Sequence, residues 1–156
     1  MKRMLTILMA LAAGTLATML GLRYARLKAT GLASEQAREI IDAIRRCYES
    51  TLAALDPNPA EGTTFEQRDA RATADAERLR RVVNGLRPVL NPRLMVSVES
   101  FVDSITSAQV QIMAFAINRK NRGLPDAAQS EAEQQDRRAF QQTAEPIVEQ
   151  LTKALS

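Results

Sequence analysis

Residues 94–115 have the sequence LMVSVESFVDSITSAQVQIMAF, and this stretch decides the fold. Its apolar residues step along the chain by alternating intervals of four and three, at Leu94, Val98, Phe101, Ile105, Ala108, Ile112 and Phe115. This spacing puts them on one face of an α-helix, so it predicts an amphipathic helix that packs against others. From Val110 to Ile117 the sequence is apolar nearly all round, and we expect this half to be buried on several sides.

Capping residues and prolines predict where the neighbouring helices begin and end. Asn91-Pro92 places a capping residue before a proline in the first helical position, which predicts the start of the central helix. Thr64 and Gln67 have the spacing of a capping box, and we expect a helix from there to about Leu90.

Two further helices are predicted at the two ends of the soluble region. Ser34 is the expected N-cap of a helix over about 35–55, which the prolines that follow bring to an end. Ser130 and Glu133 have the spacing of a second capping box, which predicts the start of the last helix. Pro146 lies inside that helix and is expected to bend it or to mark its true start.

The composition favours an all-α fold. Gly and Pro number six each, Trp is absent, and good helix formers such as Ala, Leu, Arg, Glu and Gln are plentiful. Four amphipathic helices with short connections predict an antiparallel up-down four-helix bundle over residues 32–156. The alternative is a three-helix bundle in which the helix over 35–55 serves as a membrane stalk.

Residues 1–31 form a separate predicted unit, an N-terminal transmembrane anchor. Residues 4–22, MLTILMALAAGTLATMLGL, are 19 residues without a charge. At 1.5 Å per residue a helix of that length spans about 29 Å, close to the hydrocarbon thickness of a bilayer. The alternative is a cleaved signal peptide, although the apolar run exceeds the roughly 7–15 residues usual for one.

Basic residues flank the predicted span, and we expect them to contact lipid headgroups. They are Lys2, Arg3, Arg23, Arg26 and Lys28. Because residues 1–31 contain no acidic residue, residues 32–156 are left with 16 basic and 18 acidic side chains. A nucleic-acid-binding domain carries positive charge on its folded body, so we expect no nucleic-acid partner.

Small residues recur at helical spacing within the span, which is the pattern that lets two membrane helices approach closely. One series is Ala10, Gly14 and Thr18, and the other is Ala13, Ala17 and Gly21. Because Ala is frequent throughout the chain, the alternative is that this spacing of small residues is incidental. The two flanks carry nearly equal numbers of basic residues, so their charge does not decide the orientation of the span. We slightly favour a soluble domain outside the cytoplasm. Arg outnumbers Lys and Ala is frequent, which suggests a GC-rich bacterial genome. The predicted membrane is accordingly a bacterial inner membrane.

The residues that most chemistries require are missing. The chain has no histidine and a single cysteine, Cys47, so neither a zinc site nor a di-iron bundle site can be assembled in the usual way. A Ser or Cys nucleophile commonly needs a nearby histidine as base, and no Gly-rich phosphate-binding motif is present. We therefore expect a non-enzymatic protein without a cofactor or metal. Cys47 itself is expected to be a small buried hydrophobe.

The charged residues suggest one docking surface. Arg71, Arg78 and Arg81 fall on one predicted helix face and form a possible docking surface, since Arg is favoured at protein interfaces. Acidic residues on the same helix cancel much of this charge. Glu133 and Arg137 have the spacing of a solvated ion pair within one helix.

Together these patterns predict a membrane-anchored helical bundle that acts as a structural or protein-interaction module. Its partners would be membrane lipid and either another protein or its own copies. The alternative is a membrane-tethered ligand-binding or sensory bundle, with a pocket near the polar residues Thr51, Asp69 and Asn84. An exposed apolar seam would favour the first function, and an enclosed cavity with convergent polar groups would favour the second.

Overall fold

The described part of the chain is all-helical, as the composition predicts. The computed structural model describes residues 32–57, 62–122 and 127–156. These contain four α-helices, which are α2 (Ser34–Ala54), α3 (Phe65–Leu86), α4 (Pro92–Arg122) and α5 (Ala127–Leu155). None of the helices in these ranges combines the length and apolarity needed to cross a membrane. The predicted anchor over 4–22, its basic flanks and its small-residue stripes lie outside the described residues.

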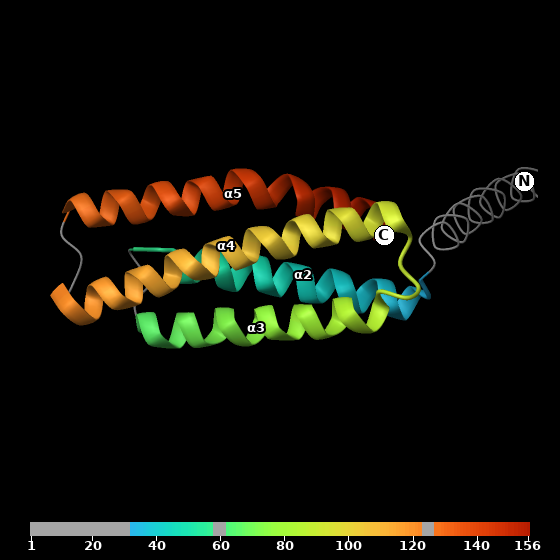
Figure 1. The fold of residues 1–156 in the computed structure, drawn as a ribbon, viewed down its shortest axis with the longest axis horizontal. Coiled ribbons are helices and arrows are strands. Elements are labelled where there is room, and N and C mark those ends of the chain that lie inside the picture. The colour runs from blue at the N-terminus through green and yellow to red at the C-terminus, as the bar shows by residue number, and fades with distance from the viewer. Residues whose placement is uncertain (1–31, 58–61, 123–126) are drawn as a thin grey trace, which may run out of the picture.

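The four helices run up and down to form a bundle (Figure 1). α2 packs against α3, α4 and α5, and it contributes buried residues along its whole length. The alternative with the first helix as a stalk is therefore wrong, because α2 lies inside the bundle. Helices that follow one another along the chain are antiparallel, as short connections require.

Among the described residues the core is mainly aliphatic, with the three buried phenylalanine rings of Phe101, Phe115 and Phe140. On α4 the predicted core face is confirmed, since Val98, Phe101, Ile105, Ala108, Ile112 and Phe115 are all buried. Leu94 is half-buried and packs against the edge of this core. From α2 the buried aliphatic residues include Ile40 and Ile44, and from α5 they include Leu151.

Two of the predicted helix starts are confirmed. The backbone N–H of Gln67 donates to Thr64 Oγ1 at 3.3 Å, and the backbone N–H of Thr64 donates to Gln67 Oε1 at 3.1 Å, which completes the capping box. Asn91 Oδ1 accepts from the backbone N–H of Arg93 at 2.9 Å, just ahead of the α4 start at Pro92.

The other helix boundaries differ from the predictions. Ser34 is the first residue of α2 rather than its cap, because the backbone N–H of Ala33 donates to Gln36 Oε1 at 3.0 Å. α3 ends at Leu86 rather than near Leu90, ahead of the proline at position 88. α5 begins at Ala127, before the predicted capping box, and continues through Pro146.

The prediction that residues 110–117 are buried on several sides is wrong. Val110, Met113 and Ile117 are 58%, 57% and 54% exposed. Only the side of α4 that carries Ile112 and Phe115 meets the core. The apolar residues on its outer side therefore face solvent.

Candidate functional site

Within the described ranges, α4 carries an exposed apolar patch. We call Val110, Met113 and Ile117 the outer strip. They lie three and four residues apart, so they adjoin one another over two turns of helix. Large exposed apolar side chains that gather in one place mark interaction sites, whereas single ones are ordinary. The strip is accordingly the candidate functional site.

Helical geometry explains why the strip faces outward. Val110 is two residues from Ala108 and from Ile112, which puts it roughly 200° away from both at 100° per residue. Both of those residues are buried in the core. The strip is thus directed away from α2 and lies on the side of α4 farthest from the core.

The strip is bordered by α3 on one flank and by α5 on the other. On one flank Arg80 of α3 donates to Gln109 Oε1 at 2.8 Å and to Thr106 Oγ1 at 3.2 Å. On the other flank Phe140 of α5 is buried and lines a groove together with Ala108 of α4. The strip lies between these flanks, so a partner can reach it without displacing either helix.

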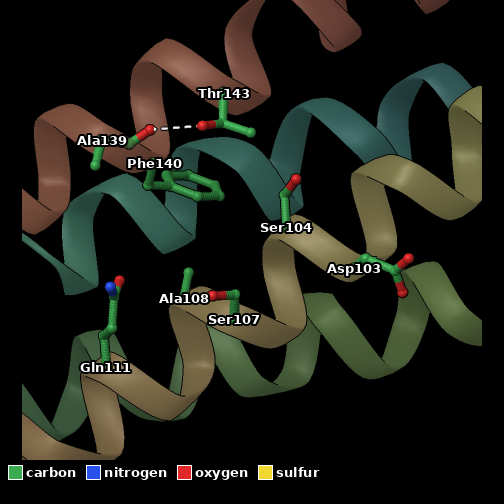
Figure 2. A pocket seen from close by; sticks show the side chains of 8 residues that line it. All are labelled: Asp103, Ser104, Ser107, Ala108, Gln111, Ala139, Phe140 and Thr143. Carbon is green, nitrogen blue, oxygen red and sulfur yellow. Dashed lines mark hydrogen bonds between the residues drawn. The ribbon is translucent and has the colours of Figure 1, made fainter.

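A groove of about 340 Å³ runs beside the strip, between α4 and α5 (Figure 2). Its lining residues are Asp103, Ser104, Ser107, Ala108, Gln111, Ala139, Phe140 and Thr143. Two of its hydroxyls are hydrogen-bonded within their own helices. Ser104 donates to the carbonyl of Ser100 at 3.0 Å, and Thr143 donates to the carbonyl of Ala139 at 2.9 Å. Asp103, Ser107 and Gln111 of α4 supply the other polar side chains of the groove.

A buried polar cluster lies at the end of the bundle where α2 ends and α3 begins. Arg119 Nη2 of α4 lies 2.5 Å from Glu133 Oε2 of α5, and the Arg119 guanidinium lies 4.1 Å from the centre of the Phe65 ring. Arg68 Nη1 donates to the carbonyls of Ala53 and Asp56 at 2.6 and 2.7 Å. These contacts tie all four helices together at that end.

Burial dominates the electrostatics of this cluster. Glu133 is 5% exposed, and its burial raises the pKa of the carboxyl, while the nearby charge of Arg119 opposes that rise. Burial lowers the pKa of Arg68, and the positive charge of Arg119 acts in the same direction. The Nε atoms of Arg68 and Arg119 are buried without a hydrogen-bond partner, but each of the two guanidiniums is held through another of its nitrogens. The cluster is therefore best explained as a structural clamp.

The sequence missed this clamp. Glu133 was expected to cap the last helix and to pair with Arg137 along the same helix. It instead reaches across to Arg119 of α4, and Arg137 lies 3.8 Å from Asp56 Oδ2. Pairing across helices leaves no signal in the spacing of residues within one helix.

The predicted arginine docking surface lies on α3, where Arg71 and Arg81 are exposed. Within α3, Arg71 Nε lies 4.0 Å from Oδ2 of the half-buried Asp75, and Arg81 Nη1 lies 3.9 Å from Oε2 of the exposed Glu77. Arg78 is half-buried. These residues lie on α3, whereas the outer strip lies on α4, so the structure separates the two surfaces by helix.

The residues proposed for a ligand pocket are not brought together. Thr51 is fully buried on α2, Asp69 is half-buried on α3, and Asn84 is exposed near the end of α3. Cys47 is completely buried, and burial raises the pKa of its thiol to about 12, which leaves it unreactive as a nucleophile. Across the described ranges, no group of three or more Cys, Asp or Glu side chains is placed to hold a metal ion.

Comparisons with known proteins identify no relative of this chain. No protein-family model, no curated protein and no solved structure matches this chain.

Proposed function

We propose that this chain is a non-enzymatic protein-interaction module, a helical bundle that residues 4–22 hold at a membrane. The outer strip of α4 is its contact surface. The proposal rests on Val110, Met113 and Ile117, whose side chains are each more than half exposed. They adjoin one another on a helix whose opposite face is buried in the core. Covering such side chains removes apolar surface from water, at roughly 25 cal/mol per Å².

The membrane part of the proposal is supported by the sequence. Nineteen uncharged residues over 4–22 have the length of one span, and basic residues stand on both sides. Holding the bundle at a surface raises its local concentration, so that even a small contact patch can serve.

Site-specific photo-crosslinking tests the contact surface. A benzophenone amino acid would be placed at Val110 or Ile117 in the full chain, and at Ala74 as the control, an exposed position on α3. We expect adducts with protein from positions 110 and 117, and none above background from 74. Absence of adducts at 110 and 117, or equal yields from all three positions, would refute the proposed contact surface.

Fractionation tests the anchor independently. The full chain is expected in the membrane pellet after an alkaline wash, whereas residues 32–156 alone are expected in the supernatant. A reporter fused after Ser156 that is active on only one side of the membrane then gives the orientation. A shortened protein found free of membrane would show that residues 1–31 act as a cleaved signal peptide.

A further inference from the structure

The outer strip is flanked by two exposed charges of opposite sign. Asp103 lies seven residues before Val110, and Lys120 lies seven residues after Met113. A seven-residue step returns to nearly the same side of a helix. Two adjacent rows therefore run along the outer side of α4. One row holds Asp103, Val110 and Ile117, and the other holds Thr106, Met113 and Lys120.

When a second copy of α4 packs antiparallel to the first, each row of one copy is complementary to the other row of the second copy. In an antiparallel helix pair, each row faces the opposite row of the partner helix. With Val110 opposite Met113 of the second copy, Ile117 faces Thr106, and Asp103 faces Lys120. Two-fold symmetry repeats each contact, so an Asp103–Lys120 pair lies at each end of the apolar layers.

Other arrangements of the same two helices bring unlike groups together. Parallel, in-register pairing places Asp103 against Asp103 and Lys120 against Lys120, and like charges repel. Sliding the antiparallel pair by one heptad in one direction places Val110 against Lys120. Sliding it in the other direction places Met113 against Asp103. Charge and apolar pattern therefore select one orientation and one register.

We propose that the occupant of the outer strip is a second copy of this chain, packed α4 against α4 in antiparallel orientation around Val110 and Met113. This inference rests on the proposed function, because it names the partner of the same surface. The contact is a single pair of helices and is smaller than a standard interface, so the dimer is weak and depends on local concentration. The starts of the two α2 helices lie at opposite ends of the pair, so two bundles at one membrane lie along its surface.

Cysteine crosslinking tests the orientation directly. Because Cys47 is the only cysteine in the sequence and is completely buried, the wild-type chain serves as a control that should give no crosslink. Asp103→Cys and Lys120→Cys would be made in full chains that carry different tags and treated, in the membranes of expressing cells, with a short bismaleimide. Both positions are exposed, so neither substitution disturbs the core.

The antiparallel pair predicts a distinctive crosslinking pattern. Co-expressed Asp103→Cys and Lys120→Cys chains should crosslink to each other. Either variant alone should not, because two copies of position 103 lie roughly 26 Å apart along the pair, at 1.5 Å per residue over 17 residues. Crosslinking of Asp103→Cys to itself would show parallel pairing and overturn the proposal. Absence of any crosslink in the mixture would overturn it as well.

Charge reversal provides a second test that needs no cysteine. Asp103→Lys or Lys120→Asp alone puts like charges at both ends of the pair. The yield of dimer from a photo-crosslinker at Val110 should then fall, on the order of tenfold. The double variant Asp103→Lys/Lys120→Asp restores opposite charges and should restore the yield. A double variant as poor as the single variants would contradict the proposed register.

The two tests separate this inference from the proposed function. Photo-adducts of dimer mass at Val110, together with the mixed cysteine crosslink, support both. Adducts to a different protein without any self-crosslink refute the self-association and leave the interaction surface standing. No adduct of any kind at Val110 refutes both.

Discussion

A matched pair of isoleucines on α4 tests whether the helix faces the bundle as described. Ile112 is 2% exposed in the core, whereas Ile117, five residues later, is 54% exposed on the outer strip. Replacing a buried Ile with Ala costs roughly 2–5 kcal/mol through lost transfer energy and the cavity that remains. Ala is the better helix former by about 0.4 kcal/mol, which offsets part of the loss at both positions. We therefore expect Ile112→Ala to destabilise the bundle by about 2–4 kcal/mol.

Ile117→Ala should cost only about 0.5 kcal/mol or less, because less than half of its surface is buried and little cavity forms. The assay is urea denaturation of each full-length variant in mild detergent, followed by far-ultraviolet circular dichroism. It is run at a protein concentration too low for self-association. For a domain of this size, each kcal/mol also moves the melting temperature by about 3–6 °C. Equal losses at the two positions would refute the assigned orientation of α4.

Three further substitutions or conditions test local features of the fold. Burial raises the pKa of Glu133 above its ordinary value of 4.5, so folding stability should fall as the pH rises through the raised pKa. Glu133→Gln should abolish that part of the pH dependence in denaturation curves, and an unchanged dependence would contradict the explanation. Cys47, with a thiol pKa raised to about 12, should resist alkylation at neutral pH in the folded chain and react rapidly in denaturant; equal rates would show that it is accessible. Thr64→Ala removes the cap of α3 and should cost about 1 kcal/mol in the same unfolding assay, whereas Thr64→Asn should cost much less.

Much of the fold could be predicted because local rules decide it. The core face of α4 follows from residue spacing alone, and the capping pattern at Thr64 and Gln67 fixes the start of α3. Pro92 likewise marks the start of α4. These features depend on residues within a few positions of one another, which is the range in which helix geometry is set.

The features that the sequence did not predict depend on contacts between distant residues. Apolar composition in residues 110–117 suggested burial on several sides, although helical spacing puts Val110 opposite the core residues Ala108 and Ile112. The exposure of Val110, Met113 and Ile117 in the structure shows that this side is left uncovered. Glu133 has the spacing of a capping residue, yet Arg119 lies close enough in space to hold its carboxylate. A buried pair of this kind depends on how α4 and α5 pack together, so the spacing of residues within either helix does not predict it.

The bundle begins and finishes at one end, because α2 starts and α5 stops on the same side (Figure 1). A short glycine-rich linker could therefore join Ser156 to Leu32 without crossing the molecule. New termini could be opened between Pro88 and Val89, which are exposed in the turn that connects α3 to α4. Such a circular permutant would keep every helix pair while carrying its chain ends at a place of the experimenter's choosing. The bundle could then be displayed on a bead or fused to a reporter with its α4 surface turned toward or away from the support.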